Sequence, residues 1–175
     1  MQTPPHLGGH CNRTHLDEGV LDCLIGLPIE SMVDVGCGPG GMVKMALAKG
    51  IAAFGIDGDP NVINSNIRLH DFTYGPYEMD EVDLAWSVEF LEHVPEQCLD
   101  NVFSVFRKCK YVFCTHNHLP EDNGQHVNYR SNDYWRDIFY MYGFLYESEC
   151  TKTLRRVSTM KRNFVRKTGQ FFRRI

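Results

Sequence analysis

The sequence predicts an α/β protein with a Rossmann-like, doubly wound and mostly parallel sheet in a single domain. Short apolar segments alternate with segments of helical character, which is the pattern of parallel strands joined by crossover helices. A glycine-rich loop follows the first apolar segment. The length of 175 residues suits one domain.

In the first part of the chain we expect one helix before the sheet and then alternating strands and helices. Residues 12–27 are expected to form the first helix, and the apolar segments 32–35 and 52–56 to form the first two strands. Between these strands, residues 41–49 have helical character and are followed by Gly50, a residue type that commonly ends helices. A short third strand is expected in IRLHDFT, before Asp71.

The second part of the chain continues the alternation. Segments 82–86 and 111–114 predict the fourth and fifth strands, and segments 95–108 and 131–142 predict helices. Residues 144–149 and 170–173 are expected to form later strands, and the structure between them is left open. Ligands of such sheets bind at the carboxyl ends of the strands, so we expect the functional site there.

Composition excludes several classes of protein. Hydrophobic residues make up 43% of the chain and charged residues 23%, which disfavours disorder, collagen and coiled coil. The sequence has no apolar run of membrane-spanning length and no secretion signal at its start. Seven cysteines without a C-x-x-C motif indicate free thiols in a reducing compartment and disfavour a structural zinc site. We therefore expect a cytoplasmic protein without membrane contact.

Basic residues are concentrated near the end of the sequence. Residues 152–174 hold nine of the 18 Lys and Arg residues and none of the 22 Asp and Glu residues. Such a segment can bind the phosphates of a nucleic acid. It can equally form a solvated face that offsets the acidic remainder of the chain, and both interpretations stay open.

The glycine-rich loop in MVDVGCGPGG indicates a nucleotide-type ligand. Glycine permits sharp turns and close approach of the backbone to a ligand, and the loop supplies Gly36, Gly38, Gly40 and Gly41. The spacing also fits the dinucleotide fingerprint. However, Asp34 precedes the loop, and its carboxylate would oppose a pyrophosphate and suits an amine better. Asp57, at the end of the second strand, stands where an acid accepts hydrogen bonds from ribose hydroxyls.

These residues resemble the class I S-adenosylmethionine-dependent methyltransferases, which have a seven-stranded sheet. In that family the acid-x-Gly-x-Gly-x-Gly loop holds the methionine and ribose portion of the cofactor, and the acid after the next strand holds the ribose. The resemblance therefore assigns the first role to Asp34, Gly36, Gly38 and Gly40 and the second to Asp57. It implies S-adenosylmethionine as cofactor and S-adenosylhomocysteine as product.

The resemblance covers about residues 30–115. It places Asp71 near the adenine amino group and Ser87, in DLAWSVEFLEHV, near the sulfonium. A dinucleotide-dependent dehydrogenase is disfavoured because no residues remain for its catalytic domain. The whole chain is also similar to small methyltransferases encoded by phages and other viruses, through the segments GGHCNRTH, GQHVNYRSNDYW and STMKRNFVRKTGQFF. That likeness implies the host cytoplasm as the working compartment.

A second motif, E-x-x-E-H, follows the fourth strand. On one helical turn Glu89, Glu92 and His93 would share a face, and these ligands suit Mg²⁺, Mn²⁺ or Fe²⁺. The motif is similar to that of metal-dependent O-methyltransferases, including the small-RNA 2′-O-methyltransferases. His126 is the preferred fourth ligand, ahead of His118. Alternatively the motif packs a turn without metal, and His93 or His126 acts as general base, with Glu89 as a further catalytic candidate.

The segments before and after the core are expected to complete the site. Residues 1–30 are expected to cap the cofactor, with Arg13 near its methionine carboxylate and His10 or His15 near the acceptor. A flexible N-terminus without such a role is the alternative. Residues 31–115 form the cofactor-binding core, residues 116–150 the acceptor side, and residues 151–175 the basic segment. Tyr129 is a candidate for the acceptor surface, and Trp135 is expected in the core.

Together these observations predict a methyltransferase that transfers a methyl group to an oxygen or nitrogen nucleophile. The basic segment and the E-x-x-E-H motif favour RNA or another phosphate-bearing acceptor, whereas the compact chain favours a small molecule or a glycan. The alternative from another class is a catalytically inactive module that binds the cofactor or a nucleic acid.

Overall fold

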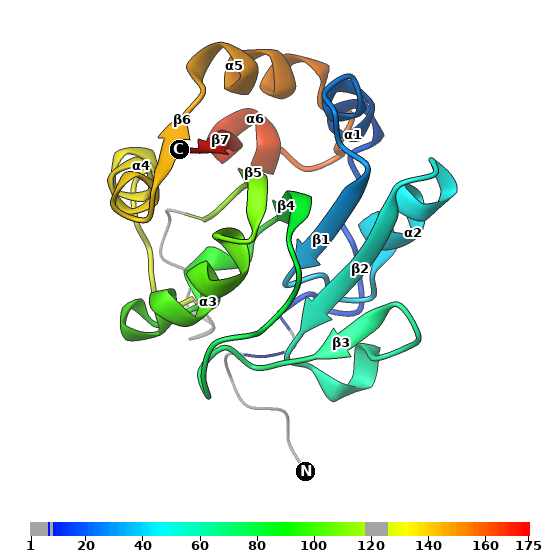
Figure 1. Cartoon of the computed structure of the whole chain (residues 1–175), viewed down its shortest axis with the longest axis vertical. Coiled ribbons are helices and arrows are strands. Elements are labelled where there is room, and N and C mark those ends of the chain that lie inside the picture. Colours follow the sequence, from blue (N-terminus) through cyan, green and yellow to red (C-terminus); the bar gives the residue numbers. More distant parts are fainter. Residues whose placement is uncertain (1–6, 8, 118–125) are drawn as a thin grey trace.

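The computed structural model describes residue 7, residues 9–117 and residues 126–175. They form a seven-stranded sheet with helices on both faces (Figure 1). The strands are β1 (Ser31–Val35), β2 (Ala52–Asp57), β3 (Ile67–Leu69), β4 (Val82–Ser87), β5 (Cys109–Cys114), β6 (Phe144–Tyr146) and β7 (Gln170–Arg174). The α-helices are α1 (Glu18–Ile25), α2 (Gly41–Ala48), α3 (Leu99–Phe106), α4 (Asn132–Met141), α5 (Ser148–Val157) and α6 (Phe164–Thr168). Three short 3₁₀ helices are η1 (Pro60–Val62), η2 (Leu91–His93) and η3 (Glu96–Cys98).

The strand order is β3-β2-β1-β4-β5-β7-β6. The strand β7 runs antiparallel to β5 and β6, and the other neighbouring pairs are parallel. The order reverses between β1 and β4, where Asp34 of β1 is paired with Trp86 of β4. This architecture confirms the predicted doubly wound, mostly parallel sheet. It also places the expected ligand site beyond the carboxyl ends of β1 and β4.

The two faces of the sheet bury separate cores. Helices α3 and α4 cover one face, and helices α1, α2, α5 and α6 contribute to the core on the other. Successive residues of β5 alternate between them, because side chains on a strand point to opposite faces. Thus Val112 and Cys114 pack under α3 and α4, whereas Phe113 packs on the other side. Trp135 is fully buried in the first core, which confirms its expected place.

Several element boundaries differ from those expected. The first helix begins only at Glu18, because Asp17 caps it by accepting a hydrogen bond from the Val20 amide, so residues 12–17 are not helical. The segment 95–108 begins its first helix only at Glu96, because Pro95 has extended backbone, and it is divided into η3 and α3 at Cys98, whose φ and ψ angles are −101° and 3°. The strand expected over 144–149 ends at Tyr146, since α5 begins at Ser148. The described part of the chain contains no helix long and apolar enough to cross a membrane.

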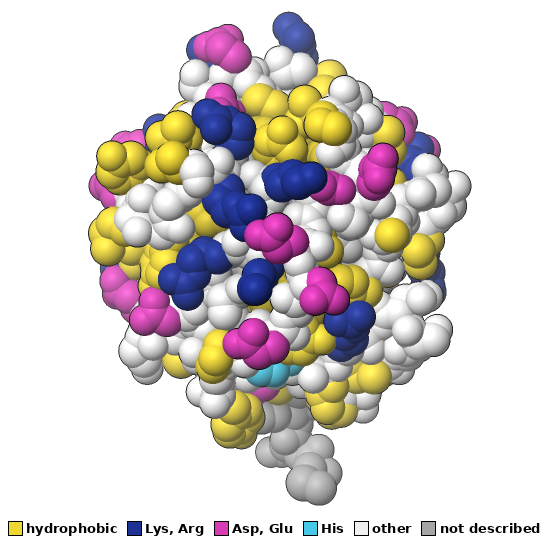
Figure 2. Space-filling view, viewed as in Figure 1, with side chains coloured by type: hydrophobic (Ala, Val, Ile, Leu, Met, Phe, Trp, Pro, Cys, Tyr) yellow, Lys and Arg dark blue, Asp and Glu magenta, His cyan; other side chains and the backbone are white. Residues whose placement is uncertain are grey.

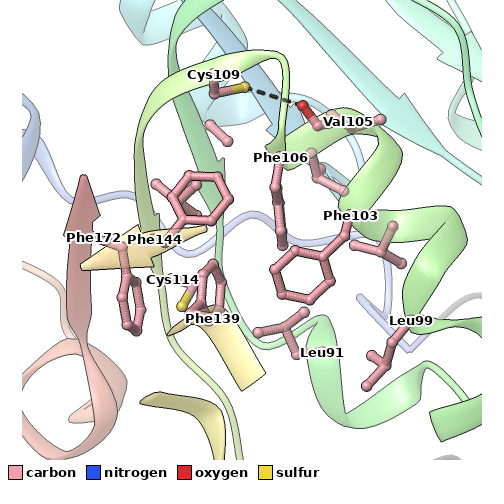
Figure 3. Close-up of a cluster of buried hydrophobic side chains, with 14 of the residues drawn as sticks. Leu91, Leu99, Phe103, Val105, Phe106, Cys109, Cys114, Phe139, Phe144 and Phe172 are labelled. Atoms are coloured by element: carbon pink, nitrogen blue, oxygen red, sulfur yellow. Dashed lines mark hydrogen bonds between the residues drawn. The ribbon is translucent and has the colours of Figure 1, made fainter. Parts of the chain in front are cut away.

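The core under α3 and α4 is rich in phenylalanine (Figure 3). The Phe139 ring stacks on the Phe172 ring at a centroid distance of 3.9 Å and meets the Phe103 ring edge-on at 4.9 Å.

Because Phe139 is fully buried, Phe139→Ala is expected to lower the free energy of unfolding by about 3–5 kcal/mol. Urea unfolding measures this loss. The neighbouring Tyr140→Ala is the control, since Tyr140 is 65% exposed, and a similar loss in both variants would contradict the packing argument.

Candidate active site

The loops that follow β1, β2, β4 and β5 enclose a cavity of about 230 Å³. The carboxyl ends of β1 and β2 contribute Asp34 and Asp57 to its lining, and the loop after β1 contributes Gly36 and Gly38. The loops after β4 and β5 contribute Glu89, His93, Asn117 and His126. The segment before α1 contributes Gly9, His10, Arg13, Thr14 and His15. Phe164, at the start of α6, completes the wall on one side. The cavity lies where the reversed strand order predicts a ligand site.

The glycine-rich loop after β1 requires glycine for two reasons. Gly36 has a φ angle of 73°, in the region that side-chain-bearing residues rarely adopt. In addition, a Cβ atom at Gly36 would lie 2.3 Å from the Phe90 ring. Gly38 and Gly40 also have positive φ angles. Gly40 caps α2 and is not in the cavity lining, so its part in the loop is conformational.

Asp57 joins the loops after β1 and β2. Its Oδ2 atom accepts a hydrogen bond of 2.7 Å from the Gly38 amide, and its Oδ1 atom accepts one of 2.9 Å from the Asp59 amide. Each carboxylate oxygen has a second lone pair for a ligand. Burial raises the pKa of Asp57, against the effect of these two hydrogen bonds. The carboxylate is therefore held rigidly against the cavity by the backbone of both loops.

Asp34 is a buried acid at the floor of the cavity, 3% exposed. Burial is the main cause that raises its pKa well above the usual range, and the negative charge of Asp57 adds to the effect. A cationic ligand group placed beside Asp34 would favour the ionised carboxylate. The pair of acids therefore makes this end of the cavity suited to an amine and to hydroxyl groups.

The segment before α1 lies against the glycine-rich loop. The Thr14 hydroxyl accepts a hydrogen bond of 3.0 Å from the Gly41 amide, at the start of α2. His10 Nε2 lies 3.2 Å from Asp59 Oδ2 in the loop after β2. Arg13 and His15, on either side of Thr14 in the chain, line the cavity. The structure thus brings this segment to the glycine-rich loop and to the cavity.

The E-x-x-E-H motif does not form the single helical turn that its spacing suggests. Glu89 has a φ angle of 52° and precedes η2, which contains only residues 91–93. The Glu89 amide donates a hydrogen bond of 3.0 Å to the Thr115 hydroxyl, which in turn donates one of 2.7 Å to Glu89 Oε1. Thr115, directly after β5, therefore fixes the orientation of Glu89 from the neighbouring loop. The single helical turn predicted over residues 89–93 does not form, because the backbone at Glu89 has a left-handed conformation and the helix begins only at Leu91.

Glu92 and His93 lie close to His126, and the two histidines line the cavity. One ligand atom from each of these three residues lies within 4.8 Å of the others. The rings of His93 and His126 are in edge contact at 4.5 Å. Glu92 is fully buried, and its Oε1 atom accepts a hydrogen bond of 3.0 Å from the Asn117 amide. Three of the four predicted metal ligands are therefore adjacent, and Glu89 is not part of this group.

The loop that carries His126 is anchored to η2 by its backbone. The Glu92 carbonyl accepts hydrogen bonds of 2.8 Å from the Val127 amide and 3.0 Å from the Asn128 amide. Tyr129 contacts the His126 ring at 5.6 Å. His118, the second choice for a fourth ligand, lies outside the described residues. His116 is buried beside Trp135, at 5.9 Å between ring centroids, and does not line the cavity.

Two predicted cofactor residues lie beside the cavity rather than in its lining. The Ser87 hydroxyl is fully buried and donates a hydrogen bond of 3.0 Å to the Val35 carbonyl, which joins β4 to β1. Asp71 accepts hydrogen bonds from the Thr73 amide and hydroxyl. Sequence reasoning missed Phe164, which contacts His15 at 4.9 Å. Its segment had no assigned element, so no sequence signal placed it at the site.

The basic segment is partly paired within the protein. Lys152 contacts Glu149, Arg173 contacts Glu147, and Arg174 contacts Glu81. Figure 2 shows Lys and Arg side chains interspersed with Asp and Glu side chains on one face of the molecule. Part of the charge of residues 152–174 is therefore offset locally.

Comparison with known families gives a match over part of the chain. Residues 33–114 match a family model described as a methyltransferase domain. No curated protein matches the chain by sequence. The matched residues run from β1 to β5 and include the glycine-rich loop, Asp57 and the E-x-x-E-H motif.

Solved methyltransferase structures share the fold. A TehB-like S-adenosylmethionine-dependent methyltransferase from Corynebacterium glutamicum aligns with a TM-score of 0.64 at 14% identity, over 90% of this chain and 88% of its own. The methyltransferase domain of bacterial CtHen1-CN aligns with a TM-score of 0.57 at 16% identity, over 87% and 93%.

A third structure, the magnesium protoporphyrin IX methyltransferase of Synechocystis with bound S-adenosylhomocysteine, aligns with a TM-score of 0.58 at 14% identity, over 87% of this chain and 78% of its own. At such identities the likeness establishes the fold. That fold is the seven-stranded α/β fold of class I methyltransferases, and the match of residues 33–114 to a methyltransferase domain further supports a methyltransferase enzyme.

Proposed function

We propose that this enzyme transfers the methyl group of S-adenosylmethionine to an oxygen or nitrogen nucleophile that enters beside His93 and His126. The observation that carries the proposal is that one cavity is lined both by Asp34 and Asp57 and by these two histidines. The acids suit the amine and ribose of the cofactor. The histidines suit an acceptor that must lose a proton.

Methyl transfer requires that the acceptor is aligned with the methyl group and that a base accepts the proton of the acceptor. A lone pair of the acceptor forms a bond to the methyl carbon while the carbon–sulfur bond breaks, and the sulfur keeps the electron pair in S-adenosylhomocysteine. Holding the two reactants in line supplies much of the rate. The proton of the acceptor goes to a ring nitrogen of His93 or His126, because imidazole accepts protons near neutral pH. Glu89, held by Thr115, is positioned to orient the acceptor.

The donor set of Glu92, His93 and His126 also fits a divalent metal ion. One carboxylate and two imidazoles are the ligands of many Fe²⁺ and Mn²⁺ sites. Their grouping within 4.8 Å supports a metal-assisted alternative, with Mn²⁺ or Fe²⁺ as the ion, in which the two histidines hold the ion and do not accept the proton. A bound ion would polarise an acceptor oxygen and make its proton easier to remove.

The test is methyl transfer from S-adenosylmethionine labelled in its methyl group. Cell lysate is separated into RNA, DNA, protein and small-molecule fractions, and each is incubated with the enzyme with and without EDTA. Label in one fraction identifies the acceptor class, and loss of label with EDTA supports the metal. Binding of S-adenosylhomocysteine without transfer to any fraction would contradict the proposal and favour a cofactor-binding module.

Cofactor binding is expected to release a proton from Asp34. The raised pKa of Asp34 keeps the carboxyl protonated at pH values where an ordinary aspartate is ionised, and the ammonium group of the cofactor favours the ionised form. The affinity for S-adenosylhomocysteine should therefore rise as the pH increases through the pKa of Asp34. Calorimetry in two buffers of different ionisation enthalpy measures the proton release. Asp34→Asn should remove the proton release that is due to Asp34. A binding enthalpy of the wild type that is the same in both buffers would contradict this prediction.

The free thiols fit the expected reducing compartment. All seven cysteines lie in the described residues, and none forms a disulfide. A cytoplasmic location, and the host cytoplasm for a phage or viral enzyme, stay part of the proposal.

A further inference from the structure

A cluster of hydrogen-bond donors lies outside the cavity, where β6 ends and β7 begins. Arg136 of α4 donates a hydrogen bond of 3.0 Å from Nε to Gln170 Oε1 and one of 3.2 Å from Nη2 to the Tyr146 hydroxyl. Arg155 of α5 donates one of 2.8 Å from Nε to the carbonyl of Gly169, the residue before Gln170. Figure 1 shows β6 between α4 and α5, the helices that carry the two arginines. Two guanidinium groups from different helices are thereby held at adjacent residues of the chain.

Two donors of this cluster are buried and have no acceptor. Gln170 is fully buried, and its Nε2 atom has no hydrogen-bond partner among the described residues. The same is true of Arg155 Nη2, a buried atom of a half-buried residue. Buried polar groups of native proteins are nearly always hydrogen-bonded. The two donors therefore indicate an acceptor that the described residues do not supply.

The cluster has two positive charges and few negative ones. Asp133 contacts Arg136 Nη1 at 2.8 Å, and the Asp133 side chain is 83% exposed. Arg155 forms no ion pair with any carboxylate in the described part of the chain. Burial is the main cause that lowers the pKa of Arg155, and Tyr146 opposes this effect while Arg136 adds to it. Because a partly buried charge is costly without a counter-charge, the Arg155 guanidinium favours a bound anion.

An oxyanion matches this cluster better than a water molecule does. The oxygens of an oxyanion only accept hydrogen bonds, whereas a water molecule brings two protons into a group of donors and leaves both guanidinium charges without compensation. Guanidinium groups also bind phosphate and carboxylate groups through two parallel hydrogen bonds. The Arg136 side chain is 33% exposed, so the cluster is open to solvent on that side.

We propose that Arg136, Arg155 and Gln170 form a binding site for one phosphate group, separate from the cavity. Gln170 Nε2 and Arg155 Nη2 donate to the phosphate oxygens, and Arg136 supplies the second positive charge. None of the three residues lines the cavity, so the inference does not depend on the proposed methyl transfer. Gln170 is paired with Cys114 at the carboxyl end of β5, which places the site at the same edge of the sheet as the cavity. The phosphate group is carried either by a small molecule or by an RNA chain.

The test is calorimetric titration of the full chain with inorganic phosphate at constant ionic strength. Wild type is expected to bind one phosphate, and Arg155→Gln is expected to weaken the binding by about tenfold or more, because a hydrogen bond to a charged group is lost. Arg156→Gln is the matched control on the same helix, since Arg156 is exposed and forms no ion pair with a described residue. It should change the affinity by less than about twofold.

A second variant, Gln170→Glu, tests the site even if Arg155→Gln does not fold. It keeps the shape of the side chain and places a carboxylate of the protein itself beside the two arginines. Phosphate binding should then be lost, while the thermal midpoint of unfolding without phosphate should rise because the guanidinium charges are compensated. Absence of saturable phosphate binding by wild type, or wild-type affinity in Gln170→Glu, would overturn the inference and leave bound water as the partner of the two donors.

A separate titration with a ten-nucleotide oligouridylate distinguishes the two sources of the phosphate group. Oligouridylate binding that is tighter than phosphate binding, and that Arg155→Gln weakens by a similar factor, assigns the site to an RNA chain. Binding of inorganic phosphate without binding of oligouridylate assigns it to a small molecule. Neither readout requires methyl transfer, so a failure of the proposed function would leave both results unchanged.

Discussion

Asp57→Ala is expected to abolish measurable binding of S-adenosylmethionine. The variant loses the two hydrogen bonds proposed for the ribose hydroxyls, and it also removes the acceptor of the Gly38 and Asp59 amides. Hydrogen bonds to a charged group are worth about 1.5–3 kcal/mol each. Two such losses correspond to an affinity decrease of about 100-fold or more, and misplacement of the glycine-rich loop adds to it.

Titration with S-adenosylhomocysteine measures this effect. Asp57→Asn is measured as a second variant, because it keeps the shape of the side chain but places an N–H donor where the ligand needs a hydrogen-bond acceptor. Asp80→Ala is the control, since Asp80 is exposed and outside the cavity lining. Thermal unfolding without ligand reports whether the loops remain folded. Affinity of Asp57→Ala within about threefold of wild type, a difference below about 0.7 kcal/mol, would remove Asp57 from the cofactor site.

His126→Ala and His93→Ala are expected to lower the rate of methyl transfer by about 10²–10⁴-fold. Both side chains lie on the loops after β4 and β5, line the cavity and contact each other, so the affinity for S-adenosylhomocysteine should stay near that of wild type. A single-turnover assay with labelled cofactor, using the acceptor fraction identified above, measures the rate. Tyr140→Ala, on the exposed side of α4, serves as the control.

The two roles proposed for the histidines give different results in the same assay. If the wild-type rate depends on added Mn²⁺ and His126→Ala needs a higher Mn²⁺ concentration, His126 is a metal ligand. If EDTA has no effect and the rate of the wild type rises with pH along a single titration that His126→Ala or His93→Ala removes, that residue is the general base. A full rate in both variants would exclude either role and leave the two histidines structural.

The glycine-rich end of the cavity was predictable because its signals are local. Three glycines after an apolar strand indicate a backbone that must turn sharply, and the structure gives Gly36, Gly38 and Gly40 positive φ angles. Asp57 follows the next strand, and parallel neighbouring strands bring their carboxyl ends together. The fold class followed from the same alternation of strands and helices.

The acceptor end was less predictable because it depends on contacts between distant segments. The spacing of E-x-x-E-H describes a helix, but the hydrogen bonds between Glu89 and Thr115 hold Glu89 in a left-handed conformation outside η2. Phe164 lines the cavity in a segment that follows residues 158–159, which are hydrogen-bonded to the distant Asp17. No short motif contains such information, since each partner is an ordinary residue in its own segment.

The position of β7 has a consequence for the synthesis of this protein. Within the described strands, β6 has hydrogen bonds only to β7, and β7 also covers the outer edge of β5. On the ribosome, β6 is therefore made before its only neighbour exists, and the sheet closes only once residues 170–174 have emerged. Until then β5 presents an open edge that can pair with another nascent chain. A chain shortened before residue 170 would keep that edge permanently and is expected to aggregate rather than accumulate as folded enzyme.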